Sequence, residues 1–274
     1  MPRLNPQRAA FRDLHASGCF VIPNPWDIGT AKYLQHLGFR ALATTSAGFA
    51  FARGLPDGAV SQAEMLAHIA EIVHATDLPV NADFGSGFAD EPEEVAKNVS
   101  GCVATGVAGL SIEDSTGDAS RPLYEFSLAV DRIRAARAAI DESGTGVLLV
   151  GRAECYLIDE GNAFPESIRR LQAYADAGAD VLYAPGVKKR EEMQAIVSAV
   201  APKPVNILMF SDLGLRVSDL AEMGVRRISV GSSMARSAWT GFIRAAREIA
   251  DQGSFGGLNG LTPSSELNGL FKTG

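Results

Sequence analysis

Short apolar runs rich in Val, Ile and Leu recur along the whole chain, with polar and amphipathic segments between them. Each run is about five residues long, which is typical of strands buried on both faces of a parallel sheet. Eight runs have this character. The predicted strands cover residues 19–23, 41–45, 80–83, 109–113, 147–152, 180–184, 205–209 and 227–231.

The segments between these strands have the periodicity and the end signals of α-helices. After the second strand, apolar residues between Met65 and Val73 share one helical face, and Ser61 and Glu64 have the spacing of a capping box. A glycine stands at the expected helix end before each even-numbered strand. These glycines are Gly38, Gly106, Gly178 and Gly224. Strand and helix therefore alternate throughout.

Eight strand–helix units in 274 residues indicate an α/β fold, a (β/α)8 TIM barrel, for which about 250 residues is typical. A doubly wound open sheet is the alternative, but the first strand leads into Asn24-Pro-Trp-Asp27 and not into a Gly-rich dinucleotide fingerprint. Residues 1–252 are expected to form the barrel. Residues 253–274 form a Gly/Asn/Ser-rich tail with a last short helix, which is expected to pack on its own barrel or on a neighbouring subunit.

Composition restricts the class of function. The chain is 46% hydrophobic and 21% charged, with a net charge of −7, so binding to nucleic acid is disfavoured. No apolar run reaches the roughly 18 residues of a membrane helix, and residues 1–6 show no signal-peptide core, so a cytoplasmic protein without membrane contact is expected. Three widely spaced cysteines without a C-x-x-C motif argue against a disulfide framework or a thiolate zinc site.

The histidines indicate which chemistry to set aside. All four lie on predicted helices or in the N-terminal arm, whereas active sites of such barrels lie at the carboxyl ends of the strands. A His-based triad or a His-rich zinc site is therefore disfavoured. The histidines are His15, His36, His68 and His74.

Polar side chains lie at the carboxyl ends of three of the predicted strands. The third strand runs into Asp83 and a Gly-rich turn, with Asn81 on the same face, the fourth ends at Glu113, and the fifth ends at Arg152. These ends are expected to converge at one mouth of the barrel. The oxygen ligands Asp83, Glu113 and Asn81 suit a hard cation, Mg²⁺ or Mn²⁺, that keeps several waters.

Seven motifs then follow one another in register along nearly the whole chain. They are Asn24-Pro-Trp-Asp27, Thr44-Thr-Ser-Ala-Gly48, Gly54-Leu-Pro-Asp57, Asn81-Ala-Asp-Phe-Gly-Ser-Gly87, Ser111-Ile-Glu-Asp114, Gly151-Arg-Ala-Glu154 and Pro204-Val-Asn206. Together they resemble the isocitrate lyase / phosphoenolpyruvate mutase superfamily, in its phosphonomutase-like branch, which includes carboxyvinyl-carboxyphosphonate phosphorylmutase-like and oxaloacetate decarboxylase-like proteins.

The resemblance implies a magnesium-dependent barrel that makes or breaks a C–C or P–C bond beside a 2-oxo or 2-hydroxy acid, through an enolate of pyruvate. It also implies a homo-oligomer, a tetramer or a dimer, in which the last helices exchange between subunits. Such an exchange would explain the detached tail.

The resemblance also implies roles for individual residues. Asp83 and Glu113 correspond to metal-shell acids, and Arg152 to the arginine that holds the substrate carboxylate. Asp57 corresponds to the aspartate after the loop that cradles the same end of the substrate. That loop and the further substrate-binding positions are Thr45, Ser46, Ala47, Gly48, Asp27, Asn206 and Arg236.

Residues 114–124 are predicted to form a mobile lid, because small and charged residues dominate there up to Pro122-Leu123. Closure is expected to bring Asp114, with Asp118 or Arg121, near the reacting carbon. The candidate catalytic residues are thus Asp57, Arg152 and Asp114.

Three departures from the superfamily pattern narrow the function. Asn81 replaces the first metal-motif aspartate, which removes one negative charge from the metal shell. The lid lacks the K-x-C-G-H character of isocitrate and methylisocitrate lyases, and Pro185 replaces their glutamate. Both of these last changes point away from a tricarboxylate substrate.

The sequence therefore predicts an enzyme, a Mg²⁺-dependent lyase that cleaves a C–C bond of a small 2-oxo or 2-hydroxy dicarboxylic acid by decarboxylation or retro-aldol cleavage. One alternative is P–C chemistry on a phosphonate such as phosphonopyruvate. Another is a 2-oxo acid binding protein with little turnover, which Asn81 makes credible.

Overall fold

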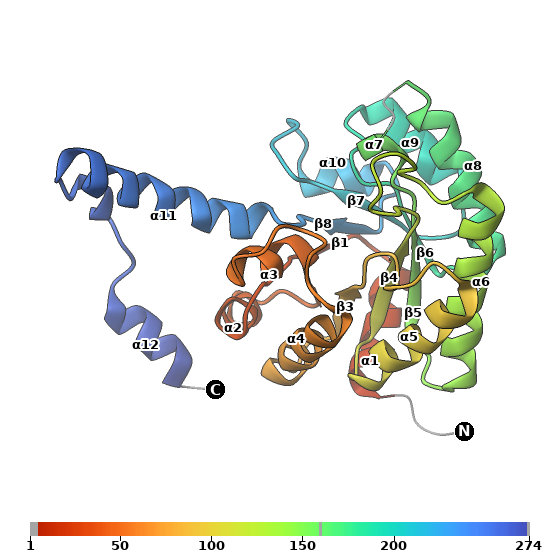
Figure 1. Cartoon of the computed structure of the whole chain (residues 1–274), viewed down its shortest axis with the longest axis horizontal. Helices are drawn as coiled ribbons and strands as arrows, with labels where there is room; N and C mark the ends of the chain where they lie inside the picture. Colours follow the sequence, from red (N-terminus) through yellow and green to blue (C-terminus); the bar gives the residue numbers. More distant parts are fainter. Residues whose placement is uncertain (1–4, 159–160, 273–274) are drawn as a thin grey trace.

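The eight strands form a single parallel sheet that curves into a nearly closed barrel with helices around it (Figure 1). This computed structural model describes residues 5–158 and 161–272; the ends of the predicted barrel domain and tail, residues 1–4 and 273–274, lie outside that range. The strand order is β1-β8-β7-β6-β5-β4-β3-β2. Between the two end strands, the backbone N–H of Ala43 donates to the carbonyl of Pro23 at 3.0 Å. The predicted (β/α)8 barrel is confirmed.

Every strand lies where the apolar runs predict it, and most are one or two residues shorter. The strands are β1 (Phe20–Ile22), β2 (Leu42–Ala43), β3 (Val80–Asp83), β4 (Gly109–Glu113), β5 (Leu148–Arg152), β6 (Val181–Tyr183), β7 (Val205–Leu208) and β8 (Arg227–Ser229).

The barrel helices begin and end at the predicted signals. Ser61 and Glu64 form the capping box of α4, and the four helix-end glycines have φ between +83° and +105°, which L side chains rarely adopt. The helices are α1 (Pro6–Ala16), α2 (Ile28–His36), α3 (Ser46–Ala52), α4 (Gln62–Ala75), α5 (Pro92–Ala104), α6 (Phe126–Glu142), α7 (Cys155–Ile158), α8 (Ala163–Asp176), α9 (Arg190–Ala199), α10 (Val217–Glu222), α11 (Ser233–Gln252), η1 (Gly256–Leu258) and α12 (Ser264–Lys272).

The core has two main parts. The larger apolar cluster fills the layer between the sheet and the surrounding helices. A smaller cluster, which includes Phe11, Phe20 and Leu148, lies where α1 packs against the amino ends of the strands. One end of the barrel is thus closed by α1, and the carboxyl ends of the strands remain available for a site.

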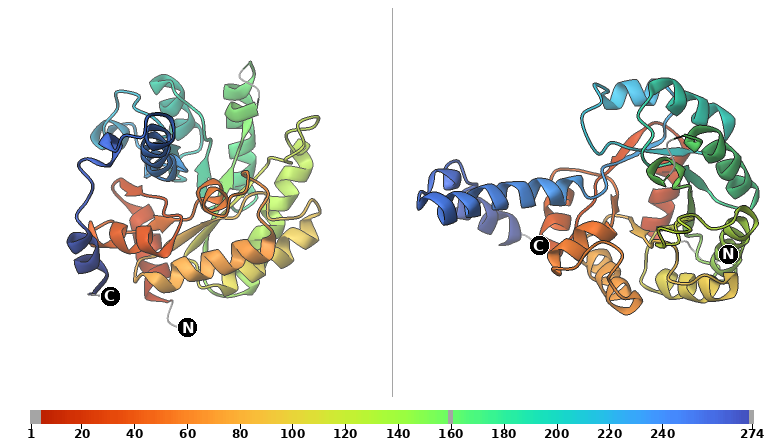
Figure 2. Two further views of the ribbon diagram at one scale, coloured as in Figure 1. Left: turned by 60° about the vertical axis from the view of Figure 1, so that its left-hand side comes forward. Right: turned by 45° about the horizontal axis from the view of Figure 1, so that its top comes forward.

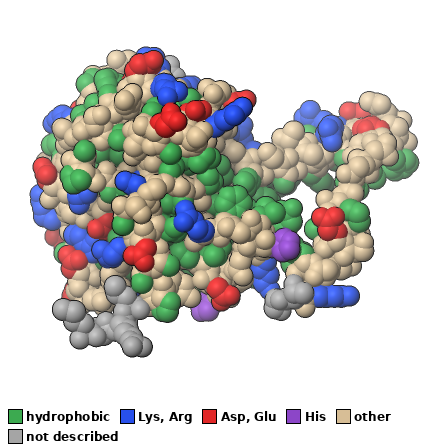
Figure 3. Space-filling view, turned by 180° about the vertical axis from the view of Figure 1, so that it is seen from behind, with side chains coloured by type: hydrophobic (Ala, Val, Ile, Leu, Met, Phe, Trp, Pro, Cys, Tyr) green, Lys and Arg blue, Asp and Glu red, His purple; other side chains and the backbone are tan. Residues whose placement is uncertain are grey.

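The C-terminal segment forms an arm that leaves the barrel. Helix α11 projects outward, and α12 folds back until it lies against α2 (Figures 1 and 2). Glu248 fastens the tip of the arm, because its carboxylate accepts hydrogen bonds from Ser254 and from the backbone N–H groups of Gly256 and Gly257. Hydrophobic side chains lie at its root and its tip (Figure 3).

Among the described helices, none is long and apolar enough to cross a membrane.

The buried His15 gives the fold a defined response to acid. Burial, and then the charge of Arg227, lowers the pKa of His15 to about 3, against an ordinary value near 6.5. Between these two pKa values His15 is protonated in the unfolded chain but not in the folded chain. The free energy of unfolding therefore falls as the pH drops from about 6.5 toward 3. Chemical denaturation between pH 7 and 4 should show this loss, and His15→Gln should reduce it.

The exposed His36 supplies the matched control, since His36→Gln should leave the pH dependence unchanged. The His15→Gln variant should still lose some stability on acidification, because burial also lowers the pKa of His68 to about 4. An identical pH profile in His15→Gln and wild type would contradict this account of His15.

Candidate active site

A cavity of about 420 Å³ lies at the carboxyl ends of the strands. Its lining combines strand ends, the turn after β3, the start of the lid and the segment before α4. The lining residues are Ser46, Asp57, Gly58, Val60, Met65, Asp83, Phe84, Gly85, Ser86, Phe88, Glu113, Ser115, Thr116, Gly117, Arg152, Glu154 and Leu157. The three predicted strand ends do converge here.

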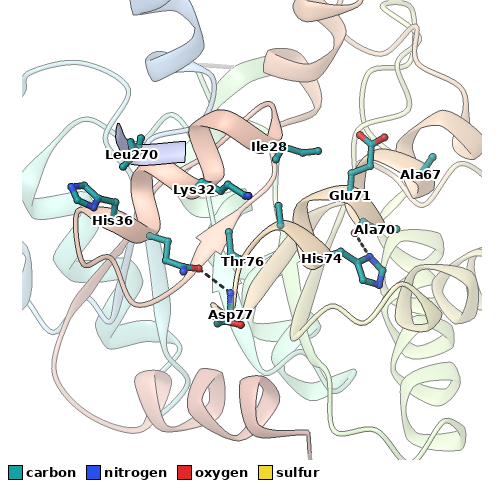
Figure 4. Close-up of a pocket in the computed structure, with 12 residues that line it drawn as sticks. Ile28, Lys32, His36, Ala67, Ala70, Glu71, His74, Thr76, Asp77 and Leu270 are labelled. Atoms are coloured by element: carbon teal, nitrogen blue, oxygen red, sulfur yellow. Dashed lines mark hydrogen bonds between the residues drawn. The ribbon is translucent and has the colours of Figure 1, made fainter. Parts of the chain in front are cut away.

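A larger groove, of about 840 Å³, lies outside the barrel between α2, α4 and α12 (Figure 4). Lys32, Glu71, His74 and Leu270 are among its lining residues. The described lining of this groove includes no strand end, so the chemistry of this architecture points to the smaller cavity.

One arginine is surrounded by three carboxylates at the cavity floor. Nη1 of Arg152 lies 3.3 Å from Oδ1 of Asp83 and 3.2 Å from Oε2 of Glu113, and its Nε donates to Oε1 of Glu154. The register explains the cluster, because Glu113 and Arg152 are paired neighbours on β4 and β5. The ring of Tyr183 lies 5.2 Å from the guanidinium carbon.

The cluster contains more carboxyl groups than the single charge of Arg152 can compensate. Burial raises the pKa of Glu113 to about 8, and the nearby Glu154 and Asp83 add to this effect against the opposing charge of Arg152. Burial also raises the pKa of Glu154 and of Asp57. The arginine shows the complementary response: burial acts to lower its pKa, but the surrounding carboxylates outweigh burial and raise it. A second cation would relieve this imbalance.

The turn after β2 places Ser46 in the wall of the cavity. Thr45 caps α3 by accepting a hydrogen bond from the N–H of Gly48 at 3.2 Å, and the N–H of Ser46 donates to Oδ2 of Asp83 at 2.9 Å. Of the predicted loop, Thr45, Ala47 and Gly48 shape the turn, while Ser46 lines the cavity beside Asp57. Ser46 also acts to lower the pKa of Asp57, against the larger opposing effect of burial.

Asn81 and Asn206 lie in a polar layer deeper in the barrel. Arg227 is buried there, and its guanidinium donates to Oδ1 of Asn206 at 2.8 Å and to Oδ1 of Asn81 at 3.3 Å. A side chain at Gly109 would collide with Asn81, since its Cβ would lie 2.7 Å from Oδ1. Both asparagines therefore point below the cavity, and the described lining of the cavity does not include them.

Two further predicted binding residues lie away from the cavity. Asp27 is the N-cap of α2 and accepts hydrogen bonds from the N–H and hydroxyl of Thr30 at 2.7 and 2.9 Å. Arg236 is exposed on α11. Local capping accounts for the position of Asp27, because an aspartate three residues before a threonine forms a capping box.

Asp114 lies behind the cavity wall. Its Oδ2 accepts hydrogen bonds from Nη1 of Arg170 at 3.0 Å and from the hydroxyl of Tyr174 at 2.6 Å, and its Oδ1 accepts from the N–H of Glu154 at 2.8 Å. The physical reason is strand alternation, which turns Asp114 away from the side that Glu113 faces. In this structure Asp114 therefore supports Glu154.

The predicted lid is tied at its base. The N–H of Tyr124 donates to the carbonyl of Asp114 at 2.9 Å, the N–H of Thr116 donates to that of Pro122 at 3.0 Å, and Ser115 and Leu123 form an antiparallel bridge. Hydrogen bonds also link residues of the tip, such as the hydroxyl of Thr116 to the carbonyl of Arg121 at 2.6 Å. The mobility of this segment stays a prediction.

The donor set can be compared with the needs of Mg²⁺. No cluster of three or more His, Cys, Asp or Glu side chains in metal-holding arrangement occurs in the part of the chain that the structure describes. Mg²⁺ needs only one or two protein carboxylates, since it retains several waters. Asp83 and Glu113 meet this requirement, because both contact the same cationic nitrogen and therefore reach the same point.

Sequence reasoning missed Glu154. It is 5% exposed and belongs to the cavity lining and to the Arg152 cluster. The signal was its position two residues after Arg152 at the end of β5, because alternate residues of an extended segment point to the same side.

The comparisons with known proteins define the class. A solved structure from Burkholderia cenocepacia J2315, provisionally described as a lyase/mutase, is 44% identical, with a TM-score of 0.94 over 97% of this chain and 96% of that one. An oxaloacetate decarboxylase of Pseudomonas putida (strain GB-1) is 30% identical over 243 residues, 84% of this chain and 81% of the relative. An uncharacterized protein of Mycobacterium tuberculosis (strain ATCC 25618 / H37Rv) is 32% identical over 243 residues, 88% and 89% of the two chains.

The barrel and its acidic mouth thus define an enzyme of the isocitrate lyase / phosphoenolpyruvate mutase superfamily, whose members are carbon–carbon lyases and phosphonomutases. Residues 11–250 match the phosphoenolpyruvate phosphomutase family, and the chain belongs to it. Members of this family depend on Mg²⁺. The predicted resemblance is confirmed.

The buried network around Asp114 should make it a stability residue. Asp114→Asn replaces one of the two carboxylate partners of the buried Arg170 by an amide, while Glu166 remains paired with it at 2.8 Å. The free energy of unfolding should therefore fall by about 2 kcal/mol, as for the loss of a buried hydrogen bond to a charged group. Urea denaturation measures the loss. The exposed Asp118→Asn in the lid tip should change stability by less than about 0.5 kcal/mol, and equal stability of the two variants would refute the network.

Proposed function

We propose that the protein is a Mg²⁺-dependent lyase that cleaves a C–C bond of a small 2-oxo or 2-hydroxy dicarboxylic acid through an enolate. Its supporting observation is the cluster at the cavity floor, in which Arg152 and the carboxylates of Asp83 and Glu113 face one space. An oxaloacetate decarboxylase among the relatives supports the same reaction class.

Each charged residue of the cavity has a separate role in such a reaction. Arg152 can hold the carboxylate beside the 2-oxo group with two parallel hydrogen bonds, which fixes the orientation of the acid. Asp83 and Glu113 would hold Mg²⁺, which when bound stabilises negative charge as it develops on the 2-oxo oxygen. Glu154 keeps Arg152 in place, and Asp57 lines the same cavity.

Decarboxylation fits the charges of the cavity. Its described lining contains one cation, Arg152, against four carboxylates, Asp57, Asp83, Glu113 and Glu154. In decarboxylation the bond to the distal carboxylate breaks, its electron pair forms the enolate, and neutral CO₂ leaves. A phosphonate would add charge at that end with no second cation to receive it.

Apolar side chains support the same choice. Val60, Met65, Phe88 and Leu157 line the cavity together with the charged cluster. An apolar wall favours a neutral product over a charged group. These residues therefore suit the release of CO₂ better than the retention of a second anionic group.

The chemistry can be tested directly on the purified protein. With Mg²⁺ and oxaloacetate, pyruvate should form well above the spontaneous rate, chelation should abolish the excess, and phosphonopyruvate should release no phosphate. Arg152→Lys keeps the charge but loses the fork, so kcat/KM should fall by about 10- to 100-fold, as for the loss of a charge-assisted hydrogen bond.

Arg169→Lys is the matched control, because Arg169 forms a surface ion pair with Glu166 and its side chain is 55% exposed. Tight binding of oxaloacetate without turnover would instead favour a binding protein. Phosphate release from phosphonopyruvate would favour P–C chemistry.

We also propose that the arm, α11 to α12, packs on a second copy of the chain in a homo-oligomer. Phe242, Phe255 and Leu261 are 63%, 64% and 66% exposed along it, and an apolar patch that includes Trp26 and Trp239 lies at its root. Exposed apolar surface of this extent marks an interaction site. The ordered tip held by Glu248 indicates a preformed contact surface.

Light scattering after size-exclusion chromatography should give a dimer or tetramer of the 28.9 kDa chain. Phe242→Asp should lower that mass, because burial of a charge in the contact is unfavourable. Gln252→Asp, at an exposed polar position of the same helix, should not. A monomeric wild type at micromolar concentration would exclude the oligomer.

A further inference from the structure

Arg152 contacts the same two oxygens that would hold Mg²⁺. One nitrogen, Nη1, lies 3.3 Å from Oδ1 of Asp83 and 3.2 Å from Oε2 of Glu113. A Mg²⁺ ion bound by both carboxylates would approach their oxygens to about 2.1 Å. Two cations cannot share these oxygens at such distances without strong repulsion.

We infer that Arg152 and Mg²⁺ compete for Asp83 and Glu113, so that the metal binds first and its binding releases Arg152 to take the carboxylate of the acid. This inference rests on the proposed metal-dependent function. It makes Arg152 both an internal counter-ion and the substrate anchor, in that order.

Glu154 lets Arg152 move without leaving the site. Its Oε1 accepts from Nε of Arg152, on the side of the guanidinium away from Nη1, and its own N–H donates to Oδ1 of Asp114 at 2.8 Å. The ion pair with Glu154 can therefore persist while Nη1 leaves Asp83 and Glu113. Glu154 acts as a positioning residue, and Asp114 fixes it from behind.

Charge explains why the acid should follow the metal. An acid that approached Arg152 while Asp83 and Glu113 still contact it would bring a fourth carboxylate to one guanidinium. Mg²⁺ adds two positive charges to the same space, which changes that repulsion into attraction. Oxalate is a suitable probe, because it is a small dicarboxylate that the enzyme cannot cleave by this route.

The sharpest test is a calorimetric titration of Mg²⁺ alone into variants of Arg152. Arg152→Gln removes the competing charge, so its affinity for Mg²⁺ should rise by about tenfold, equivalent to about 1.4 kcal/mol. Arg152→Lys keeps a competing cation and should stay close to wild type. A merely structural arginine would give the opposite result, since its loss would weaken or leave unchanged the binding of Mg²⁺.

Arg169→Gln, on the surface of α8, controls for a general change of net charge and should leave Mg²⁺ affinity unaltered. Melting temperatures in chelator establish whether Arg152→Gln is folded. If it is not, wild type alone carries the test: oxalate should raise the melting temperature with Mg²⁺ present and not in chelator, and saturating oxalate should tighten Mg²⁺ binding by linkage.

Equal binding of oxalate with and without Mg²⁺, or unchanged Mg²⁺ affinity in Arg152→Gln, would overturn the competition. These titrations involve no turnover, so a protein that binds in this order but does not cleave oxaloacetate would refute the proposed function alone. Conversely, Mg²⁺-dependent cleavage with unchanged Mg²⁺ affinity in Arg152→Gln would refute the competition alone.

Discussion

The burial of one guanidinium among three carboxylates is the constraint on which the rest of the site depends. Arg152 can remain at the cavity floor because Asp83, Glu113 and Glu154 compensate the loss of its hydration. The carboxyl groups outnumber it, and burial, with a smaller contribution from the neighbouring carboxylates, raises the pKa of Glu113. A site with more carboxyl groups than cations is suited to take up a metal together with an acid.

The surrounding layer keeps this cluster rigid. Asp114, held by Arg170 and Tyr174, fixes the backbone of Glu154. On the other side, Arg132 of α6 donates to the carbonyls of Ser86, Ala89 and Asp90 and lies 3.9 Å from the ring centre of Tyr124. The turn after β3 and the base of the lid are therefore held by the helices outside the barrel, as a preorganised site requires.

The sequence predicts the fold well because its signals are local. Strand composition, the Ser61–Glu64 capping box and the helix-end glycines act within a few residues, and each has its predicted conformation. Period-two alternation likewise predicts that Asp83, Glu113 and Arg152 meet at one mouth.

Depth within the barrel could not be predicted in the same way. Alternation places Asn81 on the face of Asp83, but its partner Arg227 lies 146 residues away, and only the closed barrel brings the two together. The position of Asp27 has a local reason, because Thr30 stands three residues later and completes a capping box with it. Glu154 was missed because its value to the site depends on Arg152 and on the distant Asp114.

Anomalous diffraction from crystals of the protein grown with Mn²⁺ and oxalate would locate the metal and Arg152 in one experiment. Mn²⁺ favours the same oxygen ligands as Mg²⁺. We predict one strong peak in the strand-end cavity, beside Asp83 and Glu113, with the guanidinium of Arg152 turned from these carboxylates toward oxalate. A peak confined to another place, such as the outer groove beside Glu71 and His74, or Arg152 still on both carboxylates with the metal bound, would contradict the account.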